Sequence, residues 1–159
     1  MLHAQNQKVV CFEVPATVAT NATSAATIDT LGFDFAHVIY VNVAATATNS
    51  TTKFSTFTVS HGTTTDASNH TTISGLQGTT NSTASSTQFV LPNCIDTSLG
   101  CVTSCFVDLR AKERYLRIVK QAPAAHSTVA GVCLLGRAIE ETPDSAADMG
   151  NTGGTVGYG

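Results

Sequence analysis

The fold is decided by the stretch Val102-Thr-Ser-Cys-Phe-Val-Asp-Leu-Arg110, which continues as Tyr115-Leu-Arg-Ile-Val-Lys120 and then as Thr128-Val-Ala-Gly-Val-Cys-Leu-Leu-Gly-Arg137. Each run is rich in β-branched, aliphatic or aromatic residues, and short polar or Pro-containing breaks separate the runs. This pattern predicts three successive antiparallel strands joined as hairpins. The stretch from residue 102 to residue 139 also holds six of the eight basic residues. The stretch therefore predicts both part of the β-architecture and the position of a basic surface.

The composition favours an all-β protein. Only 12% of the 159 residues are charged, while 42% are hydrophobic, and threonine is strongly over-represented against its usual share. Threonine is a poor helix former, and its branched Cβ suits a strand. A chain of this length forms one domain with a core of its own.

Upstream of the opening stretch, four further runs predict strands, at residues 8–14, 35–43, 54–60 and 88–91. We expect Pro15 to stop the first of these strands. The run 35–43 carries apolar side chains on both faces, which predicts a central strand covered on two sides.

Two segments show weaker patterns. Residues 16–27 predict an extended or weakly paired segment, and residues 62–87, which are dominated by Thr, Ser, Asn and Gly, predict a long loop or weakly paired edge strands. Seven or eight strands without a helix indicate an antiparallel β-sandwich, jelly-roll-like, in a single domain of residues 1–140. Residues 141–159 predict an extended Gly-rich C-terminal arm.

The five cysteines are expected to be mostly free, buried thiols, with one or more disulfides as the alternative. The spacing Cys94-x6-Cys101-x3-Cys105 does not match a zinc knuckle or ribbon, so we expect no metal site.

Several function classes find no support in the sequence. The net charge of −3 argues against direct nucleic-acid binding. No run of apolar residues is long enough for a membrane span, and the N-terminus lacks the order of a signal peptide. Neither a P-loop, a G-x-S-x-G elbow nor a dinucleotide-binding motif occurs, and the His and Asp residues are scattered. We therefore expect neither an enzyme nor a cofactor.

The basic residues of the opening stretch are the candidate binding residues. One interpretation is that they pair within the chain, with Asp108, Glu113 or Glu140. The other is that they line a contact with an acidic partner, because an arginine between apolar strand positions can pair bidentately with a carboxylate. The predicted interface residues are Arg110, Lys112, Arg114, Arg117 and Arg137, with Tyr158 in the arm.

Three segments together resemble a known family: Ile28-Asp-Thr-Leu-Gly-Phe33, then Asp108-Leu-Arg110 with Arg114-Tyr-Leu-Arg117, then Val129-Ala-Gly-Val-Cys-Leu-Leu-Gly-Arg137. The pattern resembles small structural proteins encoded in the head-gene regions of tailed bacteriophages, over roughly residues 27–140. The chain departs from them in its cysteine content and its long Thr/Ser/Asn loop.

This resemblance implies a jelly-roll or similar β-sandwich that decorates or cements an icosahedral capsid. The implied partners are the major capsid protein and further copies of the chain, as a dimer or trimer. The implied location is the capsid exterior of the virion, after synthesis in the host cytoplasm. Two alternatives are a receptor- or carbohydrate-binding fibre module that uses the loop between His61 and Thr87, and a small jelly-roll coat protein.

Overall fold

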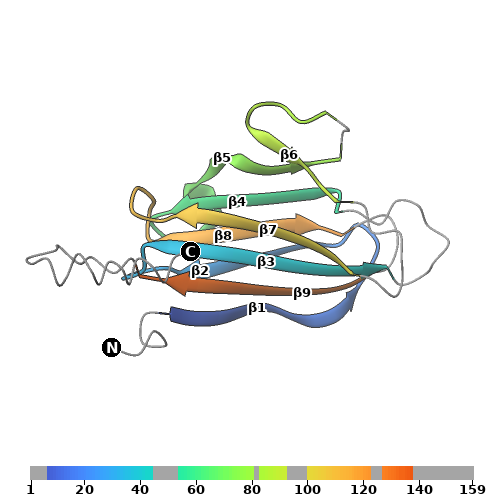
Figure 1. Ribbon diagram of the computed structural model, residues 1–159, viewed down its shortest axis with the longest axis horizontal. Coiled ribbons are helices and arrows are strands. Elements are labelled where there is room, and N and C mark those ends of the chain that lie inside the picture. The colour runs from blue at the N-terminus through green and yellow to red at the C-terminus, as the bar shows by residue number, and fades with distance from the viewer. Residues whose placement is uncertain (1–6, 45–53, 81–82, 93–99, 123–126, 138–159) are drawn as a thin grey trace, which may run out of the picture.

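The computed structural model describes residues 7–44, 54–80, 83–92, 100–122 and 127–137. These residues form two β-sheets that lie one behind the other (Figure 1). Sheet A has the strand order β1-β9-β3-β7, and its strands are β1 (Gln7–Val18), β3 (Phe35–Ala44), β7 (Cys101–Asp108) and β9 (Ser127–Gly136).

Sheet B has the order β2-β8-β4-β5-β6. Its strands are β2 (Thr23–Asp29), β4 (Thr56–Gly62), β5 (His70–Thr79), β6 (Gln88–Val90) and β8 (Tyr115–Gln121). The pairs are antiparallel, except that the short β6 runs parallel to β5. The 3₁₀ turn η2 (Ala67–Asn69) precedes β5, and the Asp66 side chain caps it by accepting a hydrogen bond from the Ser68 backbone N–H.

Early and late strands interleave in both sheets, as they do in a jelly roll. The predicted all-β sandwich is therefore confirmed. The predicted hairpins between the three late strands are wrong, because β7 pairs with β3, β8 pairs with β2 and β4, and β9 pairs with β1 and β3. Each of the late strands crosses to the other sheet, a long-range arrangement that local sequence patterns do not encode.

Strand boundaries also differ from the predictions in places. β1 continues through Pro15 to Val18, which costs no ladder hydrogen bond because β1 is an edge strand. Residues 23–29 form a fully paired strand next to β8. Part of the polar segment 62–87 forms β5, which takes the weakly patterned residues into the interior of sheet B.

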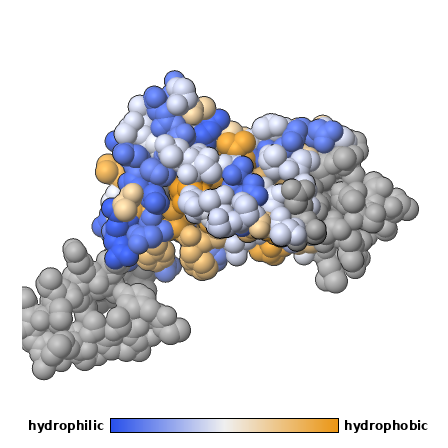
Figure 2. All heavy atoms as spheres, turned by 90° about the horizontal axis from the view of Figure 1, so that it is seen from above, coloured by the Kyte–Doolittle hydropathy of each residue, from blue (hydrophilic) through white to orange (hydrophobic). Residues whose placement is uncertain are grey.

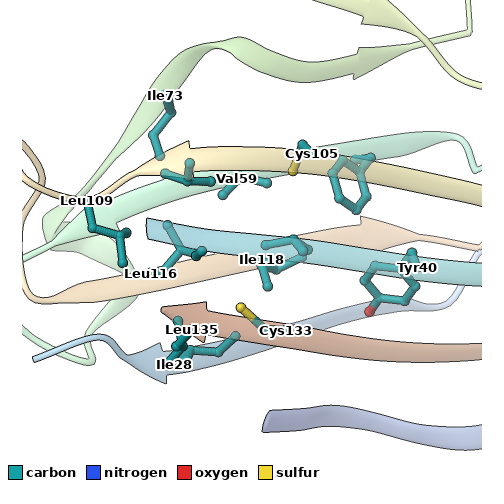
Figure 3. Close-up of a cluster of buried hydrophobic side chains, with 14 of the residues drawn as sticks. Ile28, Tyr40, Val59, Ile73, Cys105, Leu109, Leu116, Ile118, Cys133 and Leu135 are labelled. Carbon is teal, nitrogen blue, oxygen red and sulfur yellow. The ribbon is translucent and has the colours of Figure 1, made fainter. Parts of the chain in front are cut away.

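The core lies between the sheets and is built from the alternate, inward-facing residues of each strand (Figure 3). On β3 these are Ala36, Val38 and Tyr40, which are 0–2% exposed. On β8 they are Leu116 and Ile118, which are both 1% exposed. Burial of such side chains stabilises a domain by ~1.5–3 kcal/mol each. The arm predicted for residues 141–159 lies outside the described residues.

Candidate protein interface

Charged side chains gather at one end of the sandwich, where β7 ends, β8 begins and β2 leads into β3. This end is at the left of Figure 1, and the same end is blue in Figure 2, which views the molecule from above. The connection from β7 to β8 carries three of the predicted interface residues, Arg110, Lys112 and Arg114. The structure therefore brings these three together.

Arg110 is bound to its own chain. Its Nε and Nη2 atoms donate to the two carboxylate oxygens of Asp108, at 2.9 and 2.7 Å. The hydrogen bonds from Arg110 hold the pKa of Asp108 at about 2, against an ordinary value of 3.8. Both side chains are largely exposed, so the pair contributes little stability and can exchange partners. The predicted pairing of a basic residue with Asp108 is confirmed.

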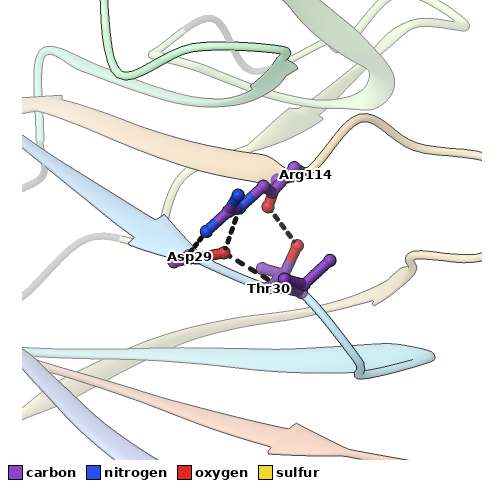
Figure 4. Close-up of polar contacts among 4 residues, drawn as sticks. Asp29, Thr30 and Arg114 are labelled. Atoms are coloured by element: carbon purple, nitrogen blue, oxygen red, sulfur yellow. Dashed lines mark hydrogen bonds and ion pairs between the residues drawn. The ribbon is translucent and has the colours of Figure 1, made fainter.

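Arg114 also pairs within the chain, but with a carboxylate that the sequence did not single out (Figure 4). Its Nε and Nη2 atoms donate to Asp29, at 2.9 and 2.6 Å, and the Thr30 hydroxyl donates to the Arg114 carbonyl at 2.6 Å. The Asp29–Arg114 pair joins the end of β2 to the start of β8. The bidentate contact with Arg114 lowers the pKa of Asp29 to about 2.

Arg137 follows β9 and folds back over the turn between β2 and β3. Its Nε donates to the Gly32 carbonyl at 2.6 Å, and its guanidinium lies 5.4 Å from the centre of the Phe33 ring. Gly32 has a φ of +82°, a conformation that glycine adopts without a steric cost. This exposed arginine therefore fixes a turn of its own chain.

The remaining predicted interface residues are Lys112, Arg117 and Tyr158. Neither Lys112 nor Arg117 makes a side-chain ion pair with another residue that the structure describes. Arg117 points outward from β8 with Tyr115 and Val119, because these residues alternate with the buried ones. Tyr158 lies outside the described residues.

The outer face of sheet A is apolar, a feature that the interface prediction did not include. It consists of the residues that alternate with the buried ones on each strand, and four of its apolar side chains are conspicuously exposed: Val9 at 67%, Val41 at 37%, Val102 at 57% and Phe106 at 71%. Between them lie the partly buried side chains of His37, Ile39, Val132 and Leu134. The sequence predicted that β3 is covered on two sides, but no described residue covers this face.

A pocket of about 410 Å³ opens at the corner where this face meets the charged end. Its lining residues are Asp34, Phe35, Phe106, Val107, Asp108 and Arg110. The Phe106 ring stacks on His37, with ring centres 3.9 Å apart and planes at 17°, which holds the exposed phenyl group in one orientation. The pocket is therefore an apolar hollow with charged groups on its rim.

The outer face of sheet B has a different chemistry. Where β8 and β4 pair, Arg117 lies opposite Ser60 and Val119 lies opposite Thr58, and β5 adds Thr72 and Gln77 to the same surface. Hydroxyl and amide groups of this kind are usual where an antiparallel sheet faces water. The two outer faces of one sandwich are thus polar on sheet B and apolar on sheet A.

A buried ionic cluster lies inside the sandwich. Lys120 is 1% exposed and points inward from β8, where its Nζ lies 2.8 Å from Glu13 Oε1 of β1. The Tyr40 hydroxyl donates to the other oxygen of the same carboxylate, and the Lys120 ammonium lies 5.6 Å from the ring centres of Tyr40 and Phe54. Burial, reinforced by the Glu13 carboxylate, raises the pKa of Tyr40.

This cluster was not predicted from the sequence, although one of its residues gave a signal. Lys120 stands two residues after Ile118 and four after Leu116, so the period of two places it on the buried face. Glu13 gave no comparable signal, because a β-bulge in β1 after Cys11 turns Phe12 and Glu13 both toward the interior. The cluster links the two sheets.

The cysteines only partly match the expectation of free thiols. Cys11 is free and exposed, and Cys105 and Cys133 are free and buried. Cys101 is disulfide-bonded. Burial raises the pKa of Cys105 to about 11 and that of Cys133 to about 12, so neither thiol ionises readily at neutral pH.

Within the described residues, no group of three or more His, Cys, Asp or Glu side chains is arranged to hold a metal ion. The same residues include no helix long and apolar enough to cross a membrane. Comparison with known proteins found no matching family model, no similar curated protein and no similar solved structure. The geometry alone therefore defines the class of this chain, a jelly-roll-like β-sandwich with one apolar outer face.

Proposed function

We propose that the chain is a non-enzymatic structural protein of a virion, which decorates or cements an icosahedral capsid by binding major capsid protein subunits. The observation that carries the proposal is the contrast between the two outer faces of the sandwich. A soluble monomer rarely leaves a contiguous apolar face open, so such a face marks a chain that works as part of an assembly. The polar face of sheet B then faces solvent, except near the start of β8, where Arg117 belongs to the charged end.

The topology supports the same class of function. Jelly rolls occur in viral capsid proteins, and also in lectins and cupins. Because one fold serves several functions, this support is an analogy at the level of the fold. The resemblance of residues 27–140 to phage head proteins selects the capsid among these uses. Many identical copies on a symmetric shell also let weak individual contacts add up.

The charged end supplies the contact with the capsid protein in this proposal. Lys112 and Arg117 make no ion pair with a described residue, and Arg137, which makes none either, is held by its hydrogen bond to the Gly32 carbonyl. The exposed Arg110–Asp108 pair is easily exchanged for a carboxylate of the partner, since surface pairs are worth only ~0–1 kcal/mol. An acidic patch on the outer surface of the shell is the matching chemistry.

Cosedimentation with empty expanded shells of the major capsid protein tests the proposal. We expect saturable binding at micromolar concentration and a higher disruption temperature of the decorated shell in calorimetry. The absence of both effects, with protein that has a β-rich circular dichroism spectrum and a cooperative unfolding transition, would contradict a decorating role.

Two matched pairs of substitutions locate the contact. Lys112→Gln with Arg117→Gln removes the free positive charges at the charged end, and we expect roughly tenfold weaker shell binding, equivalent to ~1.4 kcal/mol. The control is Thr23→Glu with Thr56→Glu, two exposed residues that both lie beside Gln121 at the other end of sheet B. This control changes the net charge by the same amount, and we expect it to leave binding unchanged.

A second candidate function is a coat protein that builds the shell from its own copies. The exposed apolar face of sheet A favours it as well, because a coat subunit also needs a surface that neighbours cover. Electron microscopy of the purified chain separates the two functions. Closed particles formed without another protein indicate a coat protein, and small soluble oligomers indicate a decorating one.

A further inference from the structure

We infer that a second copy of this chain covers the outer face of sheet A, so that two sandwiches pack face to face as a two-fold dimer. The inference goes beyond the proposed function and does not depend on it. The face that dimerises is distinct from the charged end that we propose for the capsid contact.

The outer face of sheet A is apolar at its centre, which is formed by Ile39 and Val41 of β3 and by Val132 and Leu134 of β9. In the ladder between these strands Ile39 lies opposite Val132, Val41 opposite Ala130 and His37 opposite Leu134. Among the described residues of this face, one side chain is charged. It belongs to Asp108, at the end of edge strand β7. A strongly acidic or basic partner would gain no complementary charge here, whereas a second copy brings an equally apolar surface.

The twist of sheet A also favours another sheet as its partner. Twisted sheets pack face to face about 10 Å apart through interdigitating apolar side chains, and this packing requires a second sheet of similar twist. Sheet A of a second copy meets that requirement, because it has the same twist. In a two-fold arrangement each residue meets a symmetry-related set, so one surface needs to complement only itself.

The area of the face is also sufficient for a dimer. Four strands of eight to twelve residues, ~4.8 Å apart, present a face on the order of 500 Å². Two copies therefore bury on the order of 1,000 Å² or more in total, because protruding side chains add to the flat area of each face. This total is close to the lower limit of a specific interface. Val102 and Phe106, exposed at 57% and 71%, are the side chains with the most surface to bury on β7. The stack of Phe106 on His37 holds one of them ready for contact.

The β1 edge of sheet A is a poorer candidate for association than the face. β1 contains Pro15 and two register irregularities, features that prevent regular pairing with another strand. The face and the β7 edge can be distinguished by mutation, because Val41 lies on central strand β3 and takes no part in an edge contact.

The test is the mass of the purified full chain in solution, measured by analytical ultracentrifugation from about 1 to 100 µM. We expect a dimer for the natural protein. Val102→Asp should raise the dissociation constant at least tenfold while the far-ultraviolet spectrum and the unfolding transition remain. The control is Val90→Asp, which places the same charge on an exposed valine (44%) of β6, the edge strand of the other sheet, and should leave the dimer intact.

Val41→Thr separates face-to-face packing from pairing of β7 edges. It replaces a methyl group at the centre of the face with a hydroxyl group and keeps a β-branched residue that suits a strand. The fold is therefore retained, and we expect the dimer to be weaker. A monomer at 100 µM, or a dimer that Val102→Asp and Val41→Thr leave unchanged, would overturn the inference. So would a dimer that Val102→Asp weakens and Val41→Thr does not, since that result indicates an edge contact.

A distance measurement provides a second readout without a new substitution. Cys11 is exposed and faces outward beside Val132, while the free thiols of Cys105 and Cys133 are buried. A spin label on Cys11 therefore reports one site per copy, at the β1 side of the proposed interface, and sedimentation of the labelled chain checks that the dimer persists. Pulsed electron resonance should give a defined distance between the two labels in the dimer, and Val102→Asp should abolish it. A dimer without a defined distance would contradict a single face-to-face arrangement.

Discussion

At the scale of single residues, the buried Glu13–Lys120 pair is the most consequential contact of the interior. Removing water from two charges is costly, and the mutual attraction of the ions with the added Tyr40 hydrogen bond compensates for this cost. The pair connects an edge strand of sheet A with a central strand of sheet B. It therefore contributes to how the two sheets align as well as to stability.

We expect Glu13→Ala to lower the free energy of unfolding by ~3–5 kcal/mol, because it leaves the Lys120 ammonium buried without its carboxylate. The double variant Glu13→Gln with Lys120→Met removes both charges and keeps an acceptor for the Tyr40 hydroxyl. It should lie within ~1.5 kcal/mol of the natural protein. Urea unfolding followed by circular dichroism measures both. A loss below ~1 kcal/mol for Glu13→Ala would show that the ion pair is not buried as described.

The cysteines allow a second prediction at this scale. In the folded protein at pH 8, Ellman's reagent should modify Cys11 rapidly and Cys105 and Cys133 very slowly, because burial excludes the reagent and raises the pKa values of the latter two. Unfolding without a reductant should expose three thiols, since three cysteines are free and Cys101 is disulfide-bonded. Reduction should raise the number to five. Five thiols before reduction would exclude the disulfide.

At the scale of elements, the close approach of β1 and β9 depends on a missing side chain. A Cβ atom at Gly131 would lie 2.4 Å from Cε2 of Phe12, the residue that the bulge in β1 turns inward. Phe12 in turn packs edge-on against Tyr40, with ring centres 5.1 Å apart. The bulge, the glycine and the aromatic pair thus form one packing unit.

We expect Gly131→Ala to destabilise the fold by ~1–3 kcal/mol through overpacking against Phe12. Phe12→Leu should recover part of this loss in the double variant, and a double-mutant cycle on urea unfolding measures the coupling. Gly75→Ala is the control. It meets no atom within 4 Å and is strained by its φ of +83°, so Phe12→Leu should not rescue it. Equal effects of Phe12→Leu on both variants would contradict the packing explanation.

At the scale of the whole molecule, the ion pairs of the charged end make stability depend on pH. The pKa values of Asp29 and Asp108 are about 2 in the folded chain, below the ordinary value of 3.8. Between these values the unfolded chain binds more protons than the folded chain, so stability rises with pH in that range. The contribution is complete above about pH 4 and is lost as the pH falls through 2.

The melting temperature should therefore fall between pH 4 and pH 2. In the variant Asp29→Asn with Asp108→Asn this fall should be shallower, because the groups that take up the protons are absent. Thermal unfolding at a series of pH values checks the slope, and carbon-detected NMR titration checks the two pKa values. Equal slopes for the variant and the natural protein would contradict depressed pKa values at these two carboxyls.

The surface of the whole molecule was only partly predictable. The sequence placed six of the eight basic residues between residues 102 and 139, and in the structure Arg110, Lys112 and Arg114 lie together on the β7–β8 connection. The partner of Arg114 could not be foreseen, since Asp29 lies 85 residues away in sequence and meets it only because β2 pairs with β8. The apolar face was visible as the second apolar side of residues 35–43. Its openness was not, because exposure depends on what the rest of the chain covers.

The sequence by itself determined the strand content, the single domain and the faces of the strands 35–43 and 115–121, because these follow from local β-propensity and from a period of two. Only the tertiary structure decided which strands pair, that Lys120 and Glu13 meet in the interior, and that none of the described residues covers the apolar outer face of sheet A. These features depend on contacts between residues far apart in the chain. Such contacts are set by the packing of two whole sheets, and no local pattern records them.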